Sequence, residues 1–185
     1  MLLKAHSLTE KQLMQGCVDR DPKCQKGVFD RYGSKMLAVV RRYARHEMEA
    51  EDMLQDGFVK VFKYIDTFGN RGSFEGWIRR IMINTALKHC SKVAFKKESI
   101  GVEKLPENST DPAIFSKLGI DELMKLVQDL PDGYRIVFNL YAVEGYSHKE
   151  IADLLNIGES TSRSQLVKAR RILQQRVEEL AKIAV

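Results

Sequence analysis

The sequence is poor in residues that interrupt helices or cross-link small domains. Its 185 residues include four prolines, twelve glycines and three cysteines, and no apolar run approaches the roughly eighteen residues of a membrane-spanning helix. Cys17, Cys24 and Cys90 are odd in number and lack metal-ligand spacing, which indicates reduced thiols in a cytoplasmic protein. The N-terminal residues become charged too soon for a signal peptide. We therefore expect neither secretion nor direct membrane insertion.

Signatures of catalysis are also missing. The four histidines are scattered along the chain, and His89 and Cys90 are adjacent rather than spaced as metal ligands. No phosphate-binding loop, nucleophile elbow or paired-carboxylate pattern occurs. We expect no enzymatic activity, no cofactor, no bound metal and no small-molecule substrate.

Charge is distributed unevenly along the chain. The formal net charge is +5, but residues 69–97 alone carry seven basic residues and one acid, a balance of +6. Residues 98–133 carry eight acids and three lysines, and the remainder is mildly basic. A basic block beside an acidic segment predicts a polyanion site with a separate stretch kept away from it. An ordinary solvated helix face would give the same charges.

Apolar residues recur at helical spacing through most of the chain. Three amphipathic patterns fill residues 7–97, and Asp21-Pro22 and Ser73 are expected to begin two of these helices. Periodicity fades between about residues 94 and 119, where prolines and acids indicate a linker. Helices resume at residues 120–130 and, after a break at 131–133, at 134–143. The predicted fold class is all-α, with two small helical domains joined by a flexible acidic linker.

The segment from about Tyr141 to Leu173 predicts a helix-turn-helix. Ser147 and Glu150 have the spacing of a capping box, and Asn156-Ile157-Gly158 provides the turn. The residues predicted to face inward are Ile151, Ala152, Leu154, Leu155, Leu166, Ala169 and Leu173. The outward residues of the second helix, which suit base edges and phosphates, are Arg163, Ser164, Val167, Lys168 and Arg171. A plain helical hairpin with an exposed basic face is the alternative.

Two sets of motifs carry a family resemblance. The stretch Glu144–Ala152, with Ser160-Thr161 and Lys168-Ala169-Arg170, resembles the fourth conserved region of bacterial RNA polymerase sigma factors. The blocks Ala50–Phe62 and Phe74–Ala86 resemble the second region. From about Thr9 to Leu180 the chain is similar to the extracytoplasmic-function (ECF) group, the minimal members of the sigma-70 family. The resemblance implies a region 2 domain at residues 1–95, a linker at 96–118 and a region 4 domain at 119–185.

The resemblance also implies a function and a set of partners. A protein of this group binds core polymerase, recognises the −10 and −35 promoter elements and nucleates promoter melting. The implied partners are promoter DNA, the β′ clamp and β flap of polymerase, and an anti-sigma factor. Polymerase binding would fall to a stripe of Asp52, Gln55 and Asp56. An acidic and amide stripe on a DNA-binding protein should face a basic protein surface, and a solvated helix face is the alternative.

By resemblance, two further sets of residues would contact DNA. The set for the −10 element is Tyr64, Phe68, Gly69, Asn70, Arg71, Arg80, Ile81, Asn84, Lys88 and Lys92. The set for the −35 element is Ser147, His148, Lys149, Arg163, Ser164, Val167, Lys168 and Arg171. Aromatic and polar residues in the first set suit the capture of unstacked bases, whereas Phe74 and Trp77 are predicted to lie in the core. Ser162 and Gln165 stand where the family often has hydrophobic and basic residues, so base preference at the −35 element stays open.

Two other classes of protein fit parts of the sequence. A self-sufficient helix-turn-helix regulator, with the N-terminal half as a sensor or dimerisation domain, would bind duplex DNA tightly without polymerase. A nucleic-acid enzyme with a DNA-targeting module would show metal-dependent turnover. The charges favour the sigma-factor interpretation, because residues 134–185 carry only +2 and phosphate neutralisation sets much of the affinity for DNA. Such a domain is not expected to hold a promoter unaided.

Overall fold

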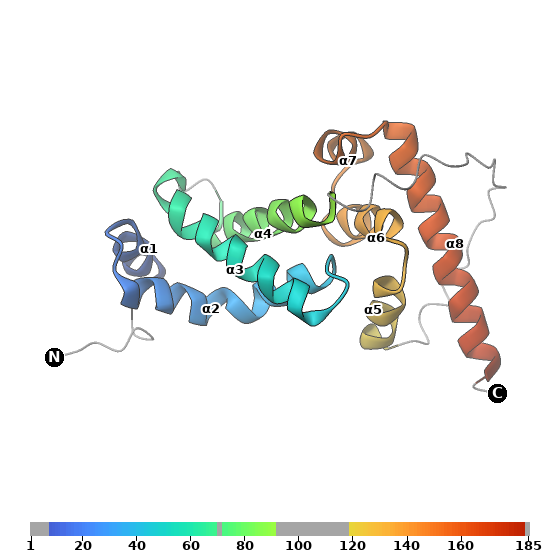
Figure 1. Ribbon diagram of the computed structural model, residues 1–185, viewed down its shortest axis with the longest axis horizontal. Coiled ribbons are helices and arrows are strands. Elements are labelled where there is room, and N and C mark those ends of the chain that lie inside the picture. The colour runs from blue at the N-terminus through green and yellow to red at the C-terminus, as the bar shows by residue number, and fades with distance from the viewer. Residues whose placement is uncertain (1–7, 70–71, 92–118, 184–185) are drawn as a thin grey trace. The chain divides into compact units, whose positions relative to one another are not determined.

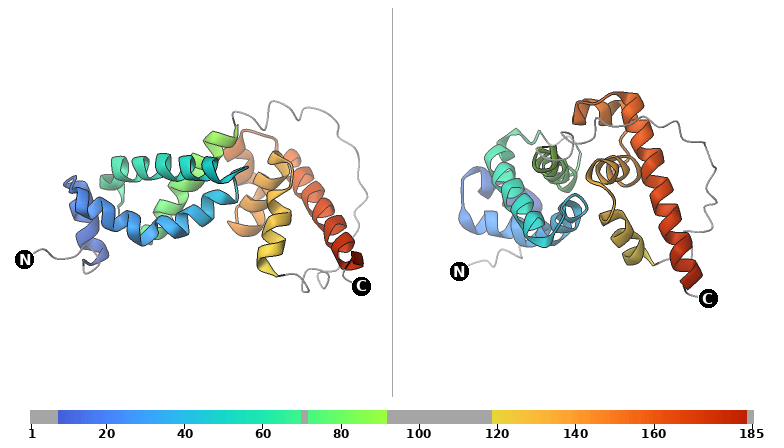
Figure 2. Two further views of the ribbon diagram at one scale, coloured as in Figure 1. Left: turned by 60° about the horizontal axis from the view of Figure 1, so that its bottom comes forward. Right: turned by 45° about the vertical axis from the view of Figure 1, so that its right-hand side comes forward.

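The computed structural model describes residues 8–69, 72–91 and 119–183. All regular elements in these ranges are helical, which confirms the all-α prediction. The chain separates into two compact units, Met1–Lys88 and His89–Val185, whose helices are labelled in Figure 1 and seen from two further sides in Figure 2. Within the described ranges every helix is too short or too polar to span a bilayer. The predicted linker at 96–118 lies outside the described residues, so it and the domain bounds around it stay predictions.

The described residues of the first unit form four α-helices and one short turn. These are α1 (Glu10–Val18), α2 (Pro22–Arg41), α3 (Glu47–Tyr64), the 3₁₀ turn η2 (Ile65–Thr67) and α4 (Phe74–Ser91). Helix α1 packs on α2, α2 packs on α3, and η2 contacts both α1 and α3. The side chain of Asp21 accepts from the backbone N–H of Lys23 at 2.8 Å, and Ser73 accepts from that of Gly76 at 3.1 Å. Both predicted helix starts are confirmed.

Helix α4 completes the core of this unit. Its side chains Phe74, Ile78 and Met82 are almost fully buried, and a Cβ on Gly57 of α3 would overlap the sulfur of Met82. Glycine at that position therefore lets α3 and α4 approach closely. A hydrogen bond of 2.9 Å from Lys60 Nζ to the buried hydroxyl of Thr85 joins the same two helices.

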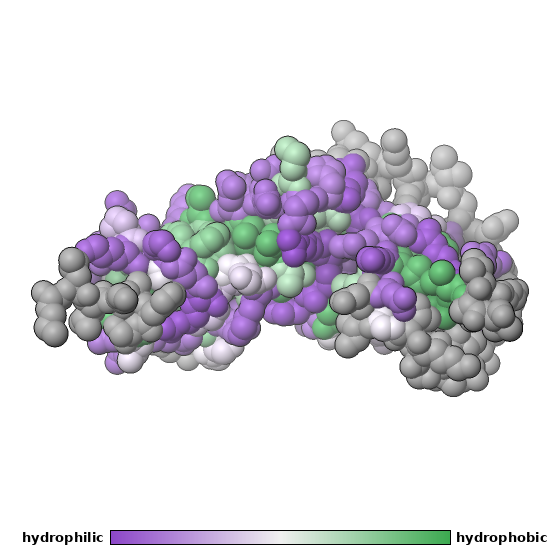
Figure 3. Space-filling view, turned by 90° about the horizontal axis from the view of Figure 1, so that it is seen from below, coloured by the Kyte–Doolittle hydropathy of each residue, from purple (hydrophilic) through white to green (hydrophobic). Residues whose placement is uncertain are grey.

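On the face seen in Figure 3, hydrophilic residues cover most of the described surface, and apolar residues form smaller patches between them.

The second unit is organised around one long helix. Its elements are α5 (Ile120–Gln128), α6 (Asp132–Phe138), the π-helical turn η4 (Asn139–Val143), α7 (His148–Leu155) and α8 (Glu159–Ile183). Helix α8 packs against α5, α6 and α7. A buried cluster of Val127, Leu130, Ala169 and Leu173 joins α8 to the end of α5. The second helix of the predicted helix-turn-helix therefore packs on the core that holds the rest of the unit.

Three details of the second unit differ from the sequence prediction. Helix α6 begins at Asp132 rather than Tyr134, because Pro131 takes the N-cap position and its fixed φ of −51° starts the helix directly. The helix predicted at 134–143 widens into the π-turn η4, and Gly145 with a φ of 77° then reverses the chain. Leu154, which was predicted to face inward, is 39% exposed.

Arg135 stabilises the corner between α5 and α6. Its side chain is almost fully buried, and its Nη1 donates to the carbonyl oxygens of Gln128 and Leu130 at 3.0 and 3.2 Å. Its Nη2 donates to the carboxylate of Asp132 at 2.7 Å. The last carbonyls of a helix have no partner within it, so one guanidinium satisfies the end of α5 and holds the first turn of α6.

All three cysteines, Cys17, Cys24 and Cys90, are buried. Burial, followed by the charges of Cys24 and Asp21, raises the pKa of the Cys17 thiol to about 12. Burial and a hydrogen bond to Asp21 also raise the pKa of Cys24. Both thiols therefore behave as packing groups between α1 and α2.

Candidate nucleic-acid and polymerase interfaces

The acidic stripe predicted on the first unit lies on the exposed face of α3. Asp52, Gln55 and Asp56 are all exposed, whereas Phe58 is buried and Phe62 is half-buried with its ring 5.8 Å from that of Phe58. The helix thus has a polar outer side and an aromatic inner side, as the spacing predicted.

Sequence reasoning missed two apolar residues beside this stripe. Met48 is 73% exposed and Val59 is 66% exposed. The spacing of residues 48, 52, 55 and 59 places all four on one face of α3. Their periodicity was visible in the sequence, but exposure of an apolar residue can be established only once the packing of α3 on α2 is known.

The aromatic residues near the end of α3 fall into two groups. Tyr64 is 45% exposed, and the Lys63 ammonium lies 5.3 Å from its ring. Phe68 is half-buried, with its ring centroid 5.3 Å from that of Phe74 and 5.5 Å from that of Trp77. Phe74 is buried, as predicted, but Trp77 is only half-buried. Phe68 is therefore held by an aromatic cluster, and Tyr64 is the more accessible ring.

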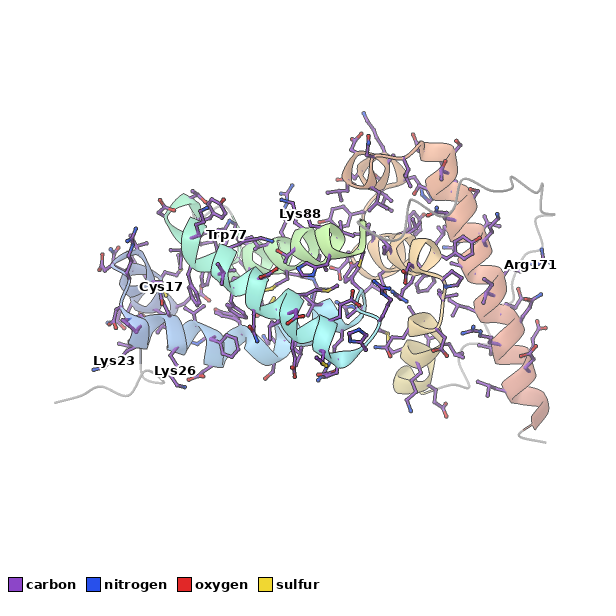
Figure 4. All side chains as sticks on the ribbon, viewed as in Figure 1. Cys17, Lys23, Lys26, Trp77, Lys88 and Arg171 are labelled. Carbon is purple, nitrogen blue, oxygen red and sulfur yellow. The ribbon has the colours of Figure 1, made fainter. Side chains whose placement is uncertain are left out.

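The described polar members of the −10 set form a line along α4. Arg80, Asn84 and Lys88 follow one another at intervals of four residues and are all exposed, and Figure 4 shows Lys88 projecting from α4 away from α2 and α3. Ile81 beside them is half-buried, and Gly69 is exposed with open space around it. Asn70, Arg71 and Lys92 lie outside the described residues.

The helix-turn-helix forms as its sequence predicted. The Ser147 hydroxyl accepts from the backbone N–H of Glu150 at 3.3 Å, and the Glu150 carboxylate accepts from that of Ser147 at 2.8 Å. Asn156 takes the left-handed conformation that ends α7, with a φ of 54°. Ile151, Leu166, Ala169 and Leu173 are buried between the helices. This geometry confirms the capping box, the turn and the inner face, apart from Leu154, which is exposed, and Ala152, which is half-buried.

The outer face of α8 carries the residues predicted for DNA contact. Arg163, Ser164, Val167 and Arg171 are exposed, and Figure 4 shows Arg171 pointing away from α6. Lys168 is half-buried, with its ammonium 6.0 Å from the ring of Tyr134. On α7, Lys149 and the capping residue Ser147 are exposed. The outward face of α8 is therefore polar and basic, with Val167 as its apolar member.

Ser162 and Gln165 are not part of that outer face. Ser162 is fully buried and Gln165 is 7% exposed. Their departure from the family pattern therefore changes the interior of the motif rather than the set of side chains turned outward.

His148 lies at the centre of a set of contacts within the motif. Its Nδ1 is 2.8 Å from the hydroxyl oxygen of Ser162, and its ring stacks on that of Tyr141 at a centroid distance of 4.6 Å and an interplanar angle of 20°. The guanidinium of Arg170 lies 5.8 Å from the centroid of the Tyr141 ring. The imidazole is thus half-buried among residues from η4 and α8.

The environment of His148 predicts a pH dependence of stability. Burial, followed by the positive charge of Arg163, lowers its pKa below the ordinary value of 6.5, with Arg170 acting in the same direction and Glu159 opposing them. A histidine with a lowered pKa in the folded state binds its proton more weakly there than in the unfolded chain. The stabilisation from His148 is therefore complete above pH 6.5, and it is lost as the pH falls through the lower pKa of the folded state.

We expect this loss in urea unfolding of the full chain between pH 7.5 and pH 5. The unfolding free energy of the native chain should fall more steeply below about pH 6.5 than that of a His148→Gln variant. Parallel curves of unfolding free energy against pH for the two proteins would show that His148 does not contribute to the pH dependence.

Comparison with known proteins identifies both units. The family model of Sigma-70 region 2 matches residues 28–95, and that of Sigma-70 region 4 matches residues 120–173. The ECF RNA polymerase sigma-E factor of Haemophilus influenzae is 23% identical over 192 residues, covering 95% of this chain and 99% of that protein. The Escherichia coli protein of the same name is 24% identical over 188 residues, covering 95% and 98%.

A solved structure has the same fold. It is the sigma factor RpoE in complex with the anti-sigma factor NepR from Bartonella quintana, matched with a TM-score of 0.50 at 18% identity over 83% of this chain and 96% of that chain. A region 2 followed by a region 4 defines a transcription initiation factor rather than an enzyme. The chain belongs to the sigma-70 family of RNA polymerase sigma factors, in its ECF group.

Proposed function

We propose that this protein directs core RNA polymerase to promoters in the cytoplasm, using α3 to bind the enzyme and α4 and α8 to bind DNA. The observation that carries the proposal is the presence of two differently charged faces in one chain of this family. An acidic face on α3 does not suit phosphate, and a basic face on α8 does. A protein that joins an enzyme to DNA needs both.

The face for polymerase is the stripe of Asp52, Gln55 and Asp56, extended by Met48 and Val59. Charged residues across an interface set orientation and association rate, and exposed apolar residues among them supply area that is buried on binding. We assign this face to the β′ clamp. The solvated-face alternative leaves the exposure of Met48 and Val59 without a role.

The face for the −10 element combines Tyr64 with the line of Arg80, Asn84 and Lys88. An exposed ring can stack on an unpaired base, and the cationic line follows a strand backbone. Phe68 supports this site by packing on Phe74 and Trp77. We also include Gly69, which follows Phe68 in the chain, and Ile81, which follows Arg80 in α4. We also assign Asn70, Arg71 and Lys92 to the −10 face, on the basis of the sequence alone.

The face for the −35 element is the outward side of α8 with the start of α7. Its members are Ser147, Lys149, Arg163, Ser164, Val167, Lys168 and Arg171. We do not assign His148 to this DNA-binding face, because its ring is close to the Ser162 hydroxyl and stacks on Tyr141. The β flap of polymerase is assigned to the same domain, outside this DNA-facing surface.

An anti-sigma factor is part of the proposal. RpoE of Bartonella quintana is bound to the anti-sigma factor NepR in its solved structure. A protein that covered α3 or the outward face of α8 would block polymerase or promoter binding. We propose that an anti-sigma factor regulates this chain by blocking its binding to polymerase or to the promoter.

Transcription reconstituted with core polymerase on genomic fragments tests the proposed function. We expect initiation from a subset of fragments only when the protein and core polymerase are both present, and weak binding of duplex DNA by the protein alone. Tight binding of a palindrome by the free protein, with no initiation, would instead support the self-sufficient regulator.

The basic face of α8 predicts a specific salt dependence. Changing Arg163, Lys168 and Arg171 together to glutamine should lower promoter occupancy by the holoenzyme about 10- to 100-fold at moderate salt. The slope of log affinity against log salt should fall by about 0.9 for each phosphate contact removed. The matched control changes Lys11, Lys23 and Lys26 to glutamine in the first unit, where all three are exposed, as Figure 4 shows for Lys23 and Lys26. Equal losses for the two triple variants would contradict a DNA-binding role for α8.

A further inference from the structure

The buried hydroxyl of Ser162 needs a partner, and His148 provides it. A hydroxyl buried without a hydrogen bond costs free energy, and Ser162 has no exposed surface. Its oxygen lies 2.8 Å from Nδ1 of His148. Because Ser162 belongs to the first turns of α8 and His148 is the first residue of α7, this bond joins the two helices of the motif at the end where both begin.

A second contact, with Tyr141, holds the same ring. His148 stacks on Tyr141 of η4, and Arg170 of α8 lies over the Tyr141 ring. Residues 162 and 170 are eight apart in α8, so they lie on one face of the helix two turns from each other. The stacked pair of His148 and Tyr141 is therefore held by α8 at both ends, through Ser162 at one and Arg170 at the other.

We propose that His148 is a positioning residue, which fixes how α8 meets α7 through its hydrogen bond to Ser162 and its stacking on Tyr141, and so determines which bases the outward face of α8 reads. This inference rests on the proposed function of α8 at the −35 element. It gives His148 no direct contact with DNA. The buried hydroxyl of Ser162 and the imidazole of His148 are joined by a directional bond, so the two residues act as one unit.

The test is a double-mutant cycle in the holoenzyme on a promoter that the native holoenzyme selects from genomic fragments. The variants are His148→Phe, which keeps a ring for stacking but loses Nδ1, and Ser162→Ala, which loses the hydroxyl. The measured quantity is the ratio of occupancy on the selected −35 sequence to that on a scrambled one. We expect each variant to lower this ratio about tenfold and the double variant to lower it no further, because residues in one contact are not additive.

Two outcomes of this double-mutant cycle would overturn the proposal. Losses that multiply to about a hundredfold in the double variant would mean that the two residues act independently. A large loss for His148→Phe with no loss for Ser162→Ala would indicate direct contact of His148 with DNA. Absence of any promoter selection by the native chain would contradict the proposed function itself, and is thus distinguishable from both.

A conservative variant and a spectroscopic signature separate positioning from loss of folding. His148→Asn retains a polar atom near the place of Nδ1 but loses the ring that stacks on Tyr141. Adding Ser162→Ala to His148→Asn should therefore lower the ratio further, unlike adding it to His148→Phe, and the absence of a further loss would count against the hydrogen bond. The nitrogen shifts of the His148 ring in the full chain should show one tautomer, and averaging of two tautomers in Ser162→Ala. Averaging already present in the native chain would refute the proposal without any DNA measurement.

Discussion

Changing Asp52 and Asp56 together to lysine is expected to abolish initiation, with a loss of binding to core polymerase of at least about a hundredfold. At the proposed interface each change would remove a favourable charge pair and add a repulsive one, and close interfacial charge pairs have coupling energies of about 1.5–7 kcal/mol. Both side chains are exposed, so the stability of the first unit should stay nearly unchanged. The measurements are co-purification with core polymerase, reconstituted transcription and thermal unfolding.

The matched control for this variant changes Asp19 and Asp30 to lysine. Both are exposed residues of the same unit, and the change in net charge is identical. Added positive charge strengthens non-specific attraction to DNA, so a loss confined to the α3 variant cannot come from weaker DNA binding. Full transcription by the α3 variant would mean that the stripe is a solvated helix face.

Changing Arg135 to methionine is expected to lower the unfolding free energy of the second unit by about 2–4 kcal/mol. The substitution leaves the carbonyls of Gln128 and Leu130 without this donor in a largely buried corner and removes the partner of Asp132. Unpaired buried polar groups and broken buried ion pairs are among the larger single-residue losses. Urea unfolding followed by circular dichroism measures the change.

Arg176→Met provides the comparison for that experiment. Arg176 also donates to a carbonyl near the end of α5, that of Asp129 at 3.3 Å, but it is more exposed and its ion pair with Asp129 spans 3.6 Å. An exposed pair of this kind contributes less than about 1 kcal/mol. Similar losses for Arg135→Met and Arg176→Met would contradict the role given to the buried guanidinium.

The features predicted correctly from the sequence are those set by residues close together in the chain. Ser147 and Glu150 lie three residues apart, and their capping box depends on nothing beyond the first turn of α7. The same holds for Asp21 before Pro22 and for Ser73 before Phe74. The inner face of α8 followed from helical periodicity, which the packing of α8 on α7 then satisfied.

The features that were missed depend on contacts between distant parts of the chain. Ser162 is buried because His148, fourteen residues earlier, meets its hydroxyl. Phe68 is half-buried because Phe74 and Trp77 of α4 lie against it. Exposure of Met48 and Val59 likewise reflects which face of α3 meets α2. Local patterns specify which face of a helix is apolar, but the partner that covers it is set by tertiary structure.

The raised pKa values of Cys17 and Cys24 bear on the chemical durability of the protein. Only the thiolate of a cysteine attacks peroxides, disulfides or alkylating reagents. With a pKa of about 12 for Cys17 and a raised value for Cys24, almost no thiolate is present at neutral pH. These two sulfurs should therefore react slowly with electrophiles for as long as α1 and α2 stay packed.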